Sequence, residues 1–490
     1  MTRSIVRLLI VLLASVMAAP TAWGAYHHGG DTDSGVAATV YPGTQDTKLD
    51  SCALCHSGGE YEKKPGKWVS LGSCQWCHYE FGYDGSGDID ATLNDYGRDY
   101  LNNGRNAAAL SAIKGVDSDG DGYSNADEIA AIRFPGDPGD DPSKVPAPHR
   151  VYARDDLECL PQHVQFMLMN THKSGDFYAQ YGGVVMADLL EDAGILAAAE
   201  SIEVFAPDGW SQYHPLDPDE DGLFYYVYGA YPEALFHYDQ EADVDMNTEE
   251  GWCDYSAASC AGRNHGDEIV VENGLQMLLA ITREGDYLSD GELNAENKLD
   301  GEGPFRVVPP QLLPGPPDQS SYLDGPDYKW PFDEAEEYTG HNAGFATRSA
   351  TIIKVNPLPE GTTDIDTAEA GWNYVDEKKI VIYGAIDPLP TIENRIESLF
   401  LKVKALDKKL FKSRFHRRAM LWKIYLVDRL IDWQAFRPAT RILEKSLIKR
   451  VDGCTKSDAP DRNDWITDCR AQKQVYWTIN EILVLMKMLP

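Results

Sequence analysis

Two Cys-x-x-Cys-His motifs near the N-terminus restrict what this chain can fold into more than any other feature. The motifs are Cys52-Ala-Leu-Cys55-His56 and Cys74-Gln-Trp-Cys77-His78. In c-type haem attachment, two thiols bond to the vinyl groups of one haem and the histidine that follows ligates its iron. A four-cysteine zinc ribbon also fits the cysteine spacing and is the alternative. The histidine after each pair favours haem, and so does an oxidising compartment.

The spacing of the two motifs predicts a pair of haems in one small module. Only 21 residues separate His56 from His78, so much of the core of this module would be porphyrin. A second axial histidine on each iron would make the haems low-spin and suited to electron transfer. The first candidates for this distal role are His27 and His28. Weaker candidates are His149, His163 and His172.

Residues 1–24 have the pattern of a cleaved secretory signal peptide. Arg3 and Arg7 lie at the start of a short apolar run, Leu8 to Val16, which is followed by small residues up to Gly24. The run is far shorter than the ~20 residues that a membrane-spanning helix needs. The two arginines are not adjacent, which indicates the Sec route and not the twin-arginine route. We therefore expect a protein that is exported unfolded and works in the periplasm or otherwise outside the cytoplasm.

The charge of the chain is large, negative and unevenly distributed. The 490 residues carry 44 Lys and Arg against 78 Asp and Glu, a formal charge of -34. This balance argues against a nucleic-acid-binding surface, which would be basic. Residues 391–490 hold 21 basic and 12 acidic side chains, a net of +9, whereas the first 390 hold 23 and 66, a net of -43. The sequence thus predicts an acidic body with a basic C-terminal piece.

A twelve-residue segment after the haem motifs matches the EF-hand calcium loop. In that loop three carboxylates, one backbone carbonyl, one polar side chain or water and one bidentate glutamate surround the cation. The matching residues are Asp117, Asp119, Asp121, Tyr123, Asn125 and Glu128, with Gly122 at the sharp turn. Closely spaced aspartates repel one another without a cation, which favours calcium over an acidic turn without metal. A single loop indicates a structural role, and the Pro-rich stretch that follows predicts a stiff linker.

The middle of the chain alternates between helix-like and strand-like patterns, which predicts a mixed α+β domain. Residues 186–193 and 269–282 have helix-like content. Residues 203–206, 305–308, 350–355 and 379–383 are typical of strands.

Three strings in this region resemble landmarks of the sulfite-oxidase-like molybdopterin domain. They are Gly183-Val-Val-Met-Ala-Asp-Leu-Leu-Glu-Asp-Ala-Gly194, Ala206-Pro-Asp-Gly209 and Gly301-Glu-Gly-Pro-Phe-Arg-Val-Val308. With the two haem motifs ahead of them, the whole arrangement resembles the GEGP-motif diheme proteins. This resemblance covers residues 50–386 and implies an exported chain with two c-type haems before a sulfite-oxidase-like domain.

The resemblance also raises the question of molybdenum. In sulfite-oxidase-like enzymes a cysteine thiolate ligates the metal, and Cys159 is the residue that the resemblance implies. The Gly-Asn that commonly follows such a cysteine is missing after Cys159. Molybdopterin is normally inserted before twin-arginine export, whereas c-type haem is attached after unfolded export. These points argue against molybdopterin and for a reused scaffold, with Cys159 as a buried thiol or half of an unexpected disulfide.

The remaining cysteines and the C-terminal hundred residues predict local structure. Cys253 with Cys260, and Cys454 with Cys469, are close enough in sequence to form local disulfides outside the cytoplasm.

Apolar residues recur every three or four positions beyond residue 389, which predicts a helical bundle. The basic residues Lys408, Lys409, Lys412, Arg414, Arg417 and Arg418 cluster there. They could contact the acidic body, anionic lipid or an acidic partner.

Together these features predict a multidomain, exported diheme c-type cytochrome that carries electrons between donor and acceptor proteins. Two alternatives stay open. One is an oxidoreductase whose middle domain holds a molybdopterin or other redox site, and the other is a calcium-stabilised structural or assembly component. The expected segments are a signal peptide at 1–24, a diheme module at 25–116, a calcium loop and linker at 117–147, an α+β domain at 148–388 and a basic bundle at 389–490.

Overall fold

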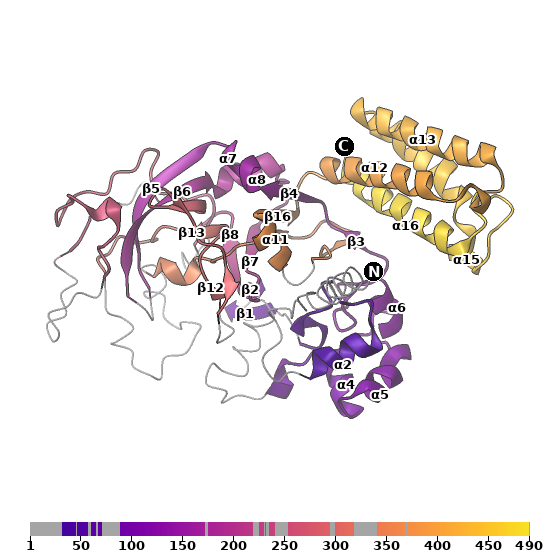
Figure 1. The fold of residues 1–490 in the computed structure, drawn as a ribbon, viewed down its shortest axis with the longest axis horizontal. Coiled ribbons are helices and arrows are strands. Elements are labelled where there is room, and N and C mark those ends of the chain that lie inside the picture. The colour runs from indigo at the N-terminus through magenta and orange to yellow at the C-terminus, as the bar shows by residue number, and fades with distance from the viewer. Residues whose placement is uncertain are drawn as a thin grey trace, which may run out of the picture.

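The chain folds into a multidomain mixed α/β structure with a helical C-terminal region (Figure 1). The computed structural model describes residues 32–45, 47–56, 60–64, 67–70, 89–171, 175–218, 225–229, 231, 235–240, 253–294, 299–317, 341–367 and 371–489. Within these ranges, no helix combines the length and apolar character that crossing a membrane requires.

The N-terminal module consists of short helices around a small core. Asparagine and serine side chains cap three of them: Asn94, Asn106 and Ser124 each accept hydrogen bonds from backbone N–H groups of the first turn. Its helices are α2 Asp33–Val40, α4 Asp95–Asn102, α5 Ala107–Ala112 and α6 Asn125–Ala130. The antiparallel pair β1 Glu60–Lys64 and β2 Lys67–Ser70 instead contacts the strand Ser211–Pro215 of the middle domain. The buried core residues are Leu49, Leu54, Tyr96, Tyr100, Ala109, Leu110, Ile113 and Ile129.

The middle domain is built on two five-stranded sheets. One has the order β10-β9-β6-β5, with β13 also paired to β9, and is antiparallel throughout. The other has the order β4-β16-β14-β7-β8, in which only β14 and β16 run parallel. The strands of the first sheet are β5 Gln162–Met169, β6 Phe177–Val185, β9 Leu278–Arg283, β10 Asp286–Tyr287 and β13 Arg306–Val308. Those of the second are β4 His149–Ala153, β7 Ser201–Phe205, β8 Ser211–Pro215, β14 Ile352–Asn356 and β16 Lys379–Gly384.

A single large apolar core joins the two sheets. It includes fully buried residues of both sheets, such as Val184 on β6 and Val204 on β7, and of helix α8 Met186–Ala193. Helix α8 ends at Gly194, whose φ of 78° lies in the left-handed region and whose added Cβ would stand 2.7 Å from the Cβ of Asp387. The helix expected at 186–193 is therefore present with those bounds.

The helix-like structure expected for residues 269–282 is absent from the fold. These residues form no helix, and their C-terminal part begins strand β9. Strand β9 pairs with β6 along one edge and with β13 and β10 along the other. This central position in a sheet overrides the weak local preference of Leu278, Leu279 and Ala280 for helix.

His214 is enclosed by the core, and its burial predicts an acid-sensitive fold. Its Nδ1 lies 2.8 Å from the carbonyl oxygen of Tyr225, and burial lowers the pKa of His214 to about 4. The neutral ring therefore contributes stability above the unfolded pKa near 6.5, and this contribution is lost as the pH falls toward 4. We expect a loss of about 3 kcal/mol over that interval. Urea unfolding across this range should show a shallower pH dependence for His214→Gln, whereas His237→Gln, at an exposed histidine, should keep it.

The Pro-rich stretch that follows the calcium loop packs against the middle domain and is not a free linker. We call this contact region the joint. Strand β3 Val145–Pro146 pairs in parallel with β15 Thr362–Thr363 of the middle domain. Lys48 of the N-terminal module reaches the same region, where its Nζ lies 2.7 Å from Asp140 and its backbone N–H donates to Asp366 at 2.8 Å. The N-terminal module is thus held to the middle domain by a buried ion pair and by β-pairing.

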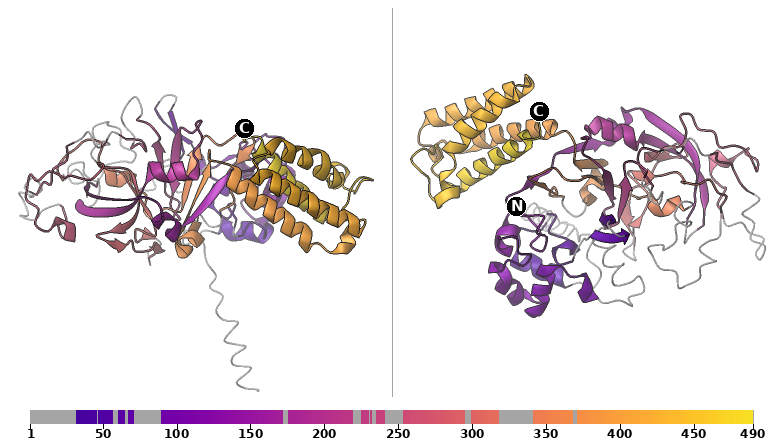
Figure 2. Two further views of the ribbon diagram at one scale, coloured as in Figure 1. Left: turned by 90° about the horizontal axis from the view of Figure 1, so that it is seen from above. Right: turned by 180° about the vertical axis from the view of Figure 1, so that it is seen from behind.

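The C-terminal region is a helical bundle at one end of the molecule (Figures 1 and 2). Its helices α13 and α16 both pack against α12 and α14. A disulfide joins Cys454 to Cys469, with a Cα–Cα distance of 5.4 Å. The helices are α12 Leu389–Ala405, α13 Arg414–Asp432, α14 Phe436–Ile442, α15 Gly453–Ser457 and α16 Cys469–Met486.

Candidate functional site

The first Cys-x-x-Cys-His motif forms a tight turn that is fixed against helix α4. Residues Cys52–Leu54 form one 3₁₀ turn, and the backbone N–H of His56 donates to the carbonyl of Cys52 at 2.9 Å. The side-chain amide of Asn94 donates to the carbonyls of the two residues between the cysteines, at 3.2 and 3.3 Å. An added Cβ at Gly97 would overlap the carbonyl oxygen of Cys55. The motif is therefore held by close backbone contact with α4.

His56 has an ordered ring. Its Nδ1 lies 2.6 Å from the hydroxyl oxygen of Thr92, a fully buried residue in a second 3₁₀ turn, Ile89–Thr92. A hydrogen bond at Nδ1 fixes the orientation of a histidine ring and makes Nε2 the nitrogen that ligates a metal. The first motif thus has the donor set, two thiols and one oriented imidazole, that a c-type haem requires.

Several expected haem residues lie outside the described residues. These are Cys74, Cys77, His78, His27, His28 and His172. Among the weaker distal candidates, His149 lies on β4 and His163 on β5, both in sheets of the middle domain. Burial lowers the pKa of both histidines. Their positions make them part of the middle domain's sheets and not of the module that holds His56.

The predicted calcium loop has the backbone pattern of a cation site. Asp117 accepts from the N–H groups of Gly120 and Gly122, at 2.8 and 3.0 Å, and both glycines have positive φ. Carboxylate oxygens of Asp117, Asp119 and Asp121 lie within 4.8 Å of one another. The loop therefore brings three carboxylates to one centre.

Unsatisfied carboxylate oxygens support a cation at this centre. Among the described residues, Oδ2 of Asp119, Oδ2 of Asp121 and both side-chain oxygens of Glu128 are buried and have no hydrogen-bond partner. Burial, with the charges of the three aspartates, raises the pKa of Glu128 to about 9, and burial raises the pKa of Asp119 to about 6. Buried carboxylates in this state need a cation or a proton. The donor set of oxygens alone fits calcium.

The Asn125 side chain also forms hydrogen bonds that hold the loop in place. Its side-chain amide donates to the carbonyl of Ile113 at 2.9 Å and to the hydroxyl of Ser118 at 2.9 Å, while its Oδ1 accepts from the Ser118 N–H at 3.3 Å. In this structure Asn125 closes the loop onto the end of the preceding helix. Ser118 belongs to the loop itself, whereas Ile113 precedes it, so the contact with Ile113 could not be read from the motif.

The expectations for Cys159 and for the Cys253–Cys260 pair also need correction. Cys159 follows helix α7 Arg154–Glu158; it is exposed, not buried, and it is a free thiol in this structure. No disulfide joins Cys253 to Cys260, although both are buried in one aromatic cluster. Burial raises the pKa of the Cys260 thiol, which the Tyr238 hydroxyl contacts. The fold thus encloses both cysteines in one cluster of aromatic rings.

Glu302 of the Gly-Glu-Gly-Pro string forms ion pairs with two arginines. Glu302 accepts from Arg283 at 2.7 Å and from Arg306 at 2.9 Å. Burial acts to raise the pKa of Glu302, but the two guanidinium groups lower it by more. The pKa is therefore below its usual value, and the carboxylate stays charged. Arg306 also donates to the hydroxyl of Tyr181 at 3.1 Å. Because both carboxylate oxygens are used internally, this glutamate fastens the loop to β9 and β13.

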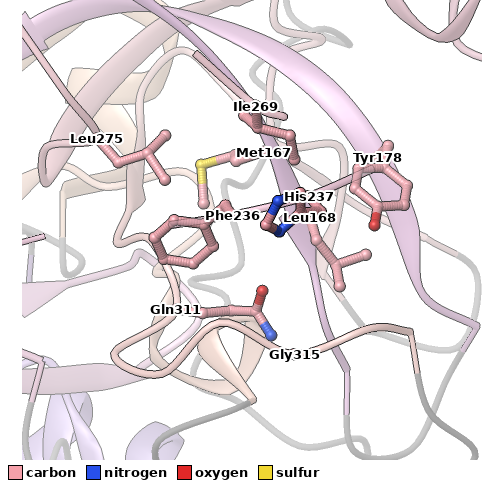
Figure 3. Close-up of a pocket in the computed structure, with 9 residues that line it drawn as sticks. All are labelled: Met167, Leu168, Tyr178, Phe236, His237, Ile269, Leu275, Gln311 and Gly315. Carbon is pink, nitrogen blue, oxygen red and sulfur yellow. The ribbon is translucent and has the colours of Figure 1, made fainter. Parts of the chain in front are cut away.

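A small cavity lies beside strand β5 (Figure 3). Its lining combines apolar side chains with His237 and Gln311. The cavity volume is about 10 Å³, enough for about one water molecule. It has no room for a pterin or a porphyrin. The lining residues are Met167, Leu168, Tyr178, Phe236, His237, Ile269, Leu275, Gln311 and Gly315.

Comparison with known proteins adds no assignment to this geometry. No family model, no curated protein and no solved structure matches this chain.

Proposed function

We propose that this chain is an exported c-type cytochrome with two haems that transfers electrons outside the cytoplasm. The observation that carries the proposal is the pair of Cys-x-x-Cys-His motifs, the first of which has its histidine oriented by Thr92. A bound haem supplies one-electron chemistry between ferric and ferrous iron. The resemblance to GEGP-motif diheme proteins supports the same assignment.

Each residue has a defined part in this proposal. Cys52 and Cys55 form the thioether bonds and His56 is the proximal ligand, while the second motif repeats these roles for the other haem. Asn94 fixes the turn between the two thiols, and Thr92 fixes the tautomer of the ligand. The partners are donor and acceptor proteins outside the cytoplasm, in keeping with the signal pattern of residues 1–24.

The calcium loop has a structural part. Its last ligand, Glu128, accepts at its carbonyl the backbone N–H of Arg133, at 2.8 Å. The Arg133 guanidinium lies 3.5 Å from Asp140, the residue that binds Lys48 in the joint. We therefore assign to calcium the role of ordering the segment that connects the haem module to the middle domain.

Composition of the purified protein tests the proposed function. The full chain, matured in a host that attaches c-type haem, should contain two covalent haems, one calcium and no molybdenum per chain, with a low-spin spectrum. Cys52→Ser with Cys55→Ser should retain one haem, and the control Cys159→Ser should retain two. Zinc in place of haem would overturn the proposal, and stoichiometric molybdenum would favour the oxidoreductase alternative.

The contact between His56 and Thr92 gives a second test. Thr92→Val removes the hydrogen bond at Nδ1 and should make the imidazole a weaker donor to iron. A hydrogen bond worth about 1 kcal/mol corresponds to about 40 mV, so the potential of one haem should rise by about that amount. Spectroelectrochemical titration measures this shift. The matched variant Thr92→Ser, which keeps the hydroxyl, should leave both potentials in place.

A further inference from the structure

The outward face of helix α13 carries a row of exposed aromatic and basic side chains. Phe415, Trp422, Tyr425 and Trp433 are between 54% and 74% exposed. Arg418 and Arg429 lie between them, and successive members are three or four positions apart, which places all six on one side of a helix. The row, here called the α13 stripe, consists of Phe415, Arg418, Trp422, Tyr425, Arg429 and Trp433.

The α13 stripe does not serve the bundle core. The core face of the same helix consists of Met420, Ile424, Val427 and Ile431, all buried. At 100° per residue, this face points about 170° away from the stripe. The stripe extends over 19 residues, about 27 Å of a straight helix. Three exposed indole or phenol rings on one helix are costly in water and indicate a surface that contacts something else.

The segment of the chain that contains the stripe is strongly basic. Residues 401–450 hold 15 Lys and Arg against four Asp and Glu, a net of +11. Lys404, Lys408, Lys409, Lys412 and Arg414 lie at the end of α12, in the connection and at the start of α13. A guanidinium N–H of Arg417 donates to the backbone carbonyl of Lys404, which fastens the ends of α12 and α13 together. At the other end, Arg429 pairs with Asp428 and Asp432 at 2.8 Å each, so the net positive charge is concentrated near Arg418.

We propose that the α13 stripe binds the surface of an anionic phospholipid bilayer. Trp and Tyr side chains, together with arginines that extend to the headgroups, are typical of membrane–water interfaces. Basic residues near an anionic leaflet add electrostatic attraction. A straight, convex row can touch a flat surface along its whole length. The body of the chain, with its large negative charge, is repelled by the same surface, which orients the bundle toward it.

The alternative occupant is a second copy of this chain. Two antiparallel stripes would place Arg418 of one copy near Asp428 and Asp432 of the other, and a contact of the stripe with the acidic body would be head-to-tail and form a ring or a filament. Either arrangement predicts self-association through the stripe, which the test below measures. In Figures 1 and 2, α13 lies on the side of the bundle away from the N-terminal module. Membrane contact through α13 therefore leaves that module accessible to soluble partners.

Vesicle binding by the full-length, haem-containing protein tests this proposal. We expect co-sedimentation with vesicles of phosphatidylglycerol and phosphatidylcholine, none with phosphatidylcholine alone, and weakening by salt. Trp422→Ala with Trp433→Ala should reduce the affinity about tenfold or more, and Arg418→Gln about fivefold. The control is Trp477→Ala. Trp477 is 47% exposed and lies on α16, a different helix of the same bundle, so it is not part of the stripe. This control should stay within about twofold of the unmodified protein.

Three results would overturn the proposal. The first is no binding to anionic vesicles at low salt, and the second is binding that neither stripe variant weakens. The third is a change in self-association, or in capture of an acidic protein, without a change in vesicle binding. Arg418→Gln changes only an exposed charge, so it keeps the test decisive if the tryptophan pair lowers stability. Haem content should be the same in every variant, so failure here is separable from failure of the proposed function.

Discussion

Replacing Asp140 with asparagine is expected to lower the free energy of unfolding by about 3–5 kcal/mol. Asp140 is 2% exposed and is surrounded by donors. Its carboxylate lies 2.7 Å from Lys48 Nζ and 3.5 Å from Arg133, accepts the N–H of Phe134 at 2.9 Å, and contacts the hydroxyl of Thr363. The amide would remove the carboxylate that lies within ion-pair distance of two buried cations. Urea unfolding of the haem-containing protein at pH 7 measures the loss.

The neighbouring residue provides a matched control for this substitution. Asp141 pairs with Lys144 at 3.7 Å near the surface, so Asp141→Asn should change stability by about 0.5 kcal/mol or less. A second variant distinguishes charge from packing. Asp140→Asn combined with Lys48→Met removes one stranded cation and should recover part of the loss. Equal stability of the Asp140→Asn and Asp141→Asn proteins would show that this ion pair does not hold the joint.

This joint marks the limit of what the sequence could predict about the fold. Lys48 and Asp140 are 92 positions apart, and Asp140 lies in a Pro-rich stretch whose composition is typical of a linker. Nothing local indicates that Lys48 is buried. By contrast, helix α8 and strands β7, β14 and β16 were predictable, because hydrophobic pattern and stop signals determine them locally. Strand β9 was not, because its pairing with two neighbours decides its conformation.

The candidate site divides in the same way. The haem and calcium motifs are contiguous, so their residue types and spacing are visible in the sequence. The contacts that make them rigid are not. Thr92 lies 36 positions after His56, and Asn94 and Gly97 reach the first motif from helix α4. The candidate ligands can therefore be named from the sequence, whereas the residues that orient them required the fold.

Calcium is expected to stabilise the chain by about 4 kcal/mol when its concentration is about 1,000 times the dissociation constant. The reason is the group of buried, unpartnered carboxylate oxygens around Glu128. Without a cation, burial and the neighbouring aspartates raise the pKa of Glu128 to about 9. A carboxyl with a raised folded-state pKa stabilises fully below its unfolded pKa, near 4.5, and this stability is lost as the pH rises toward 9. The metal-free protein should therefore weaken across this interval, and the calcium-loaded protein much less.

Glu128→Gln separates the cation from the rest of the loop. At pH 8 without a cation, Glu128 must take up a proton to be buried in the folded protein, whereas the amide is neutral in both states. In chelator at pH 8 this variant should therefore be at least as stable as the unmodified protein. With calcium it should be less stable, because the bidentate carboxylate is missing. Asp127→Asn, on the exposed side of the same helix, should keep the full calcium response. Scanning calorimetry with calcium and with chelator measures all three proteins. An equal calcium response of Glu128→Gln and Asp127→Asn would show that Glu128 is not a ligand.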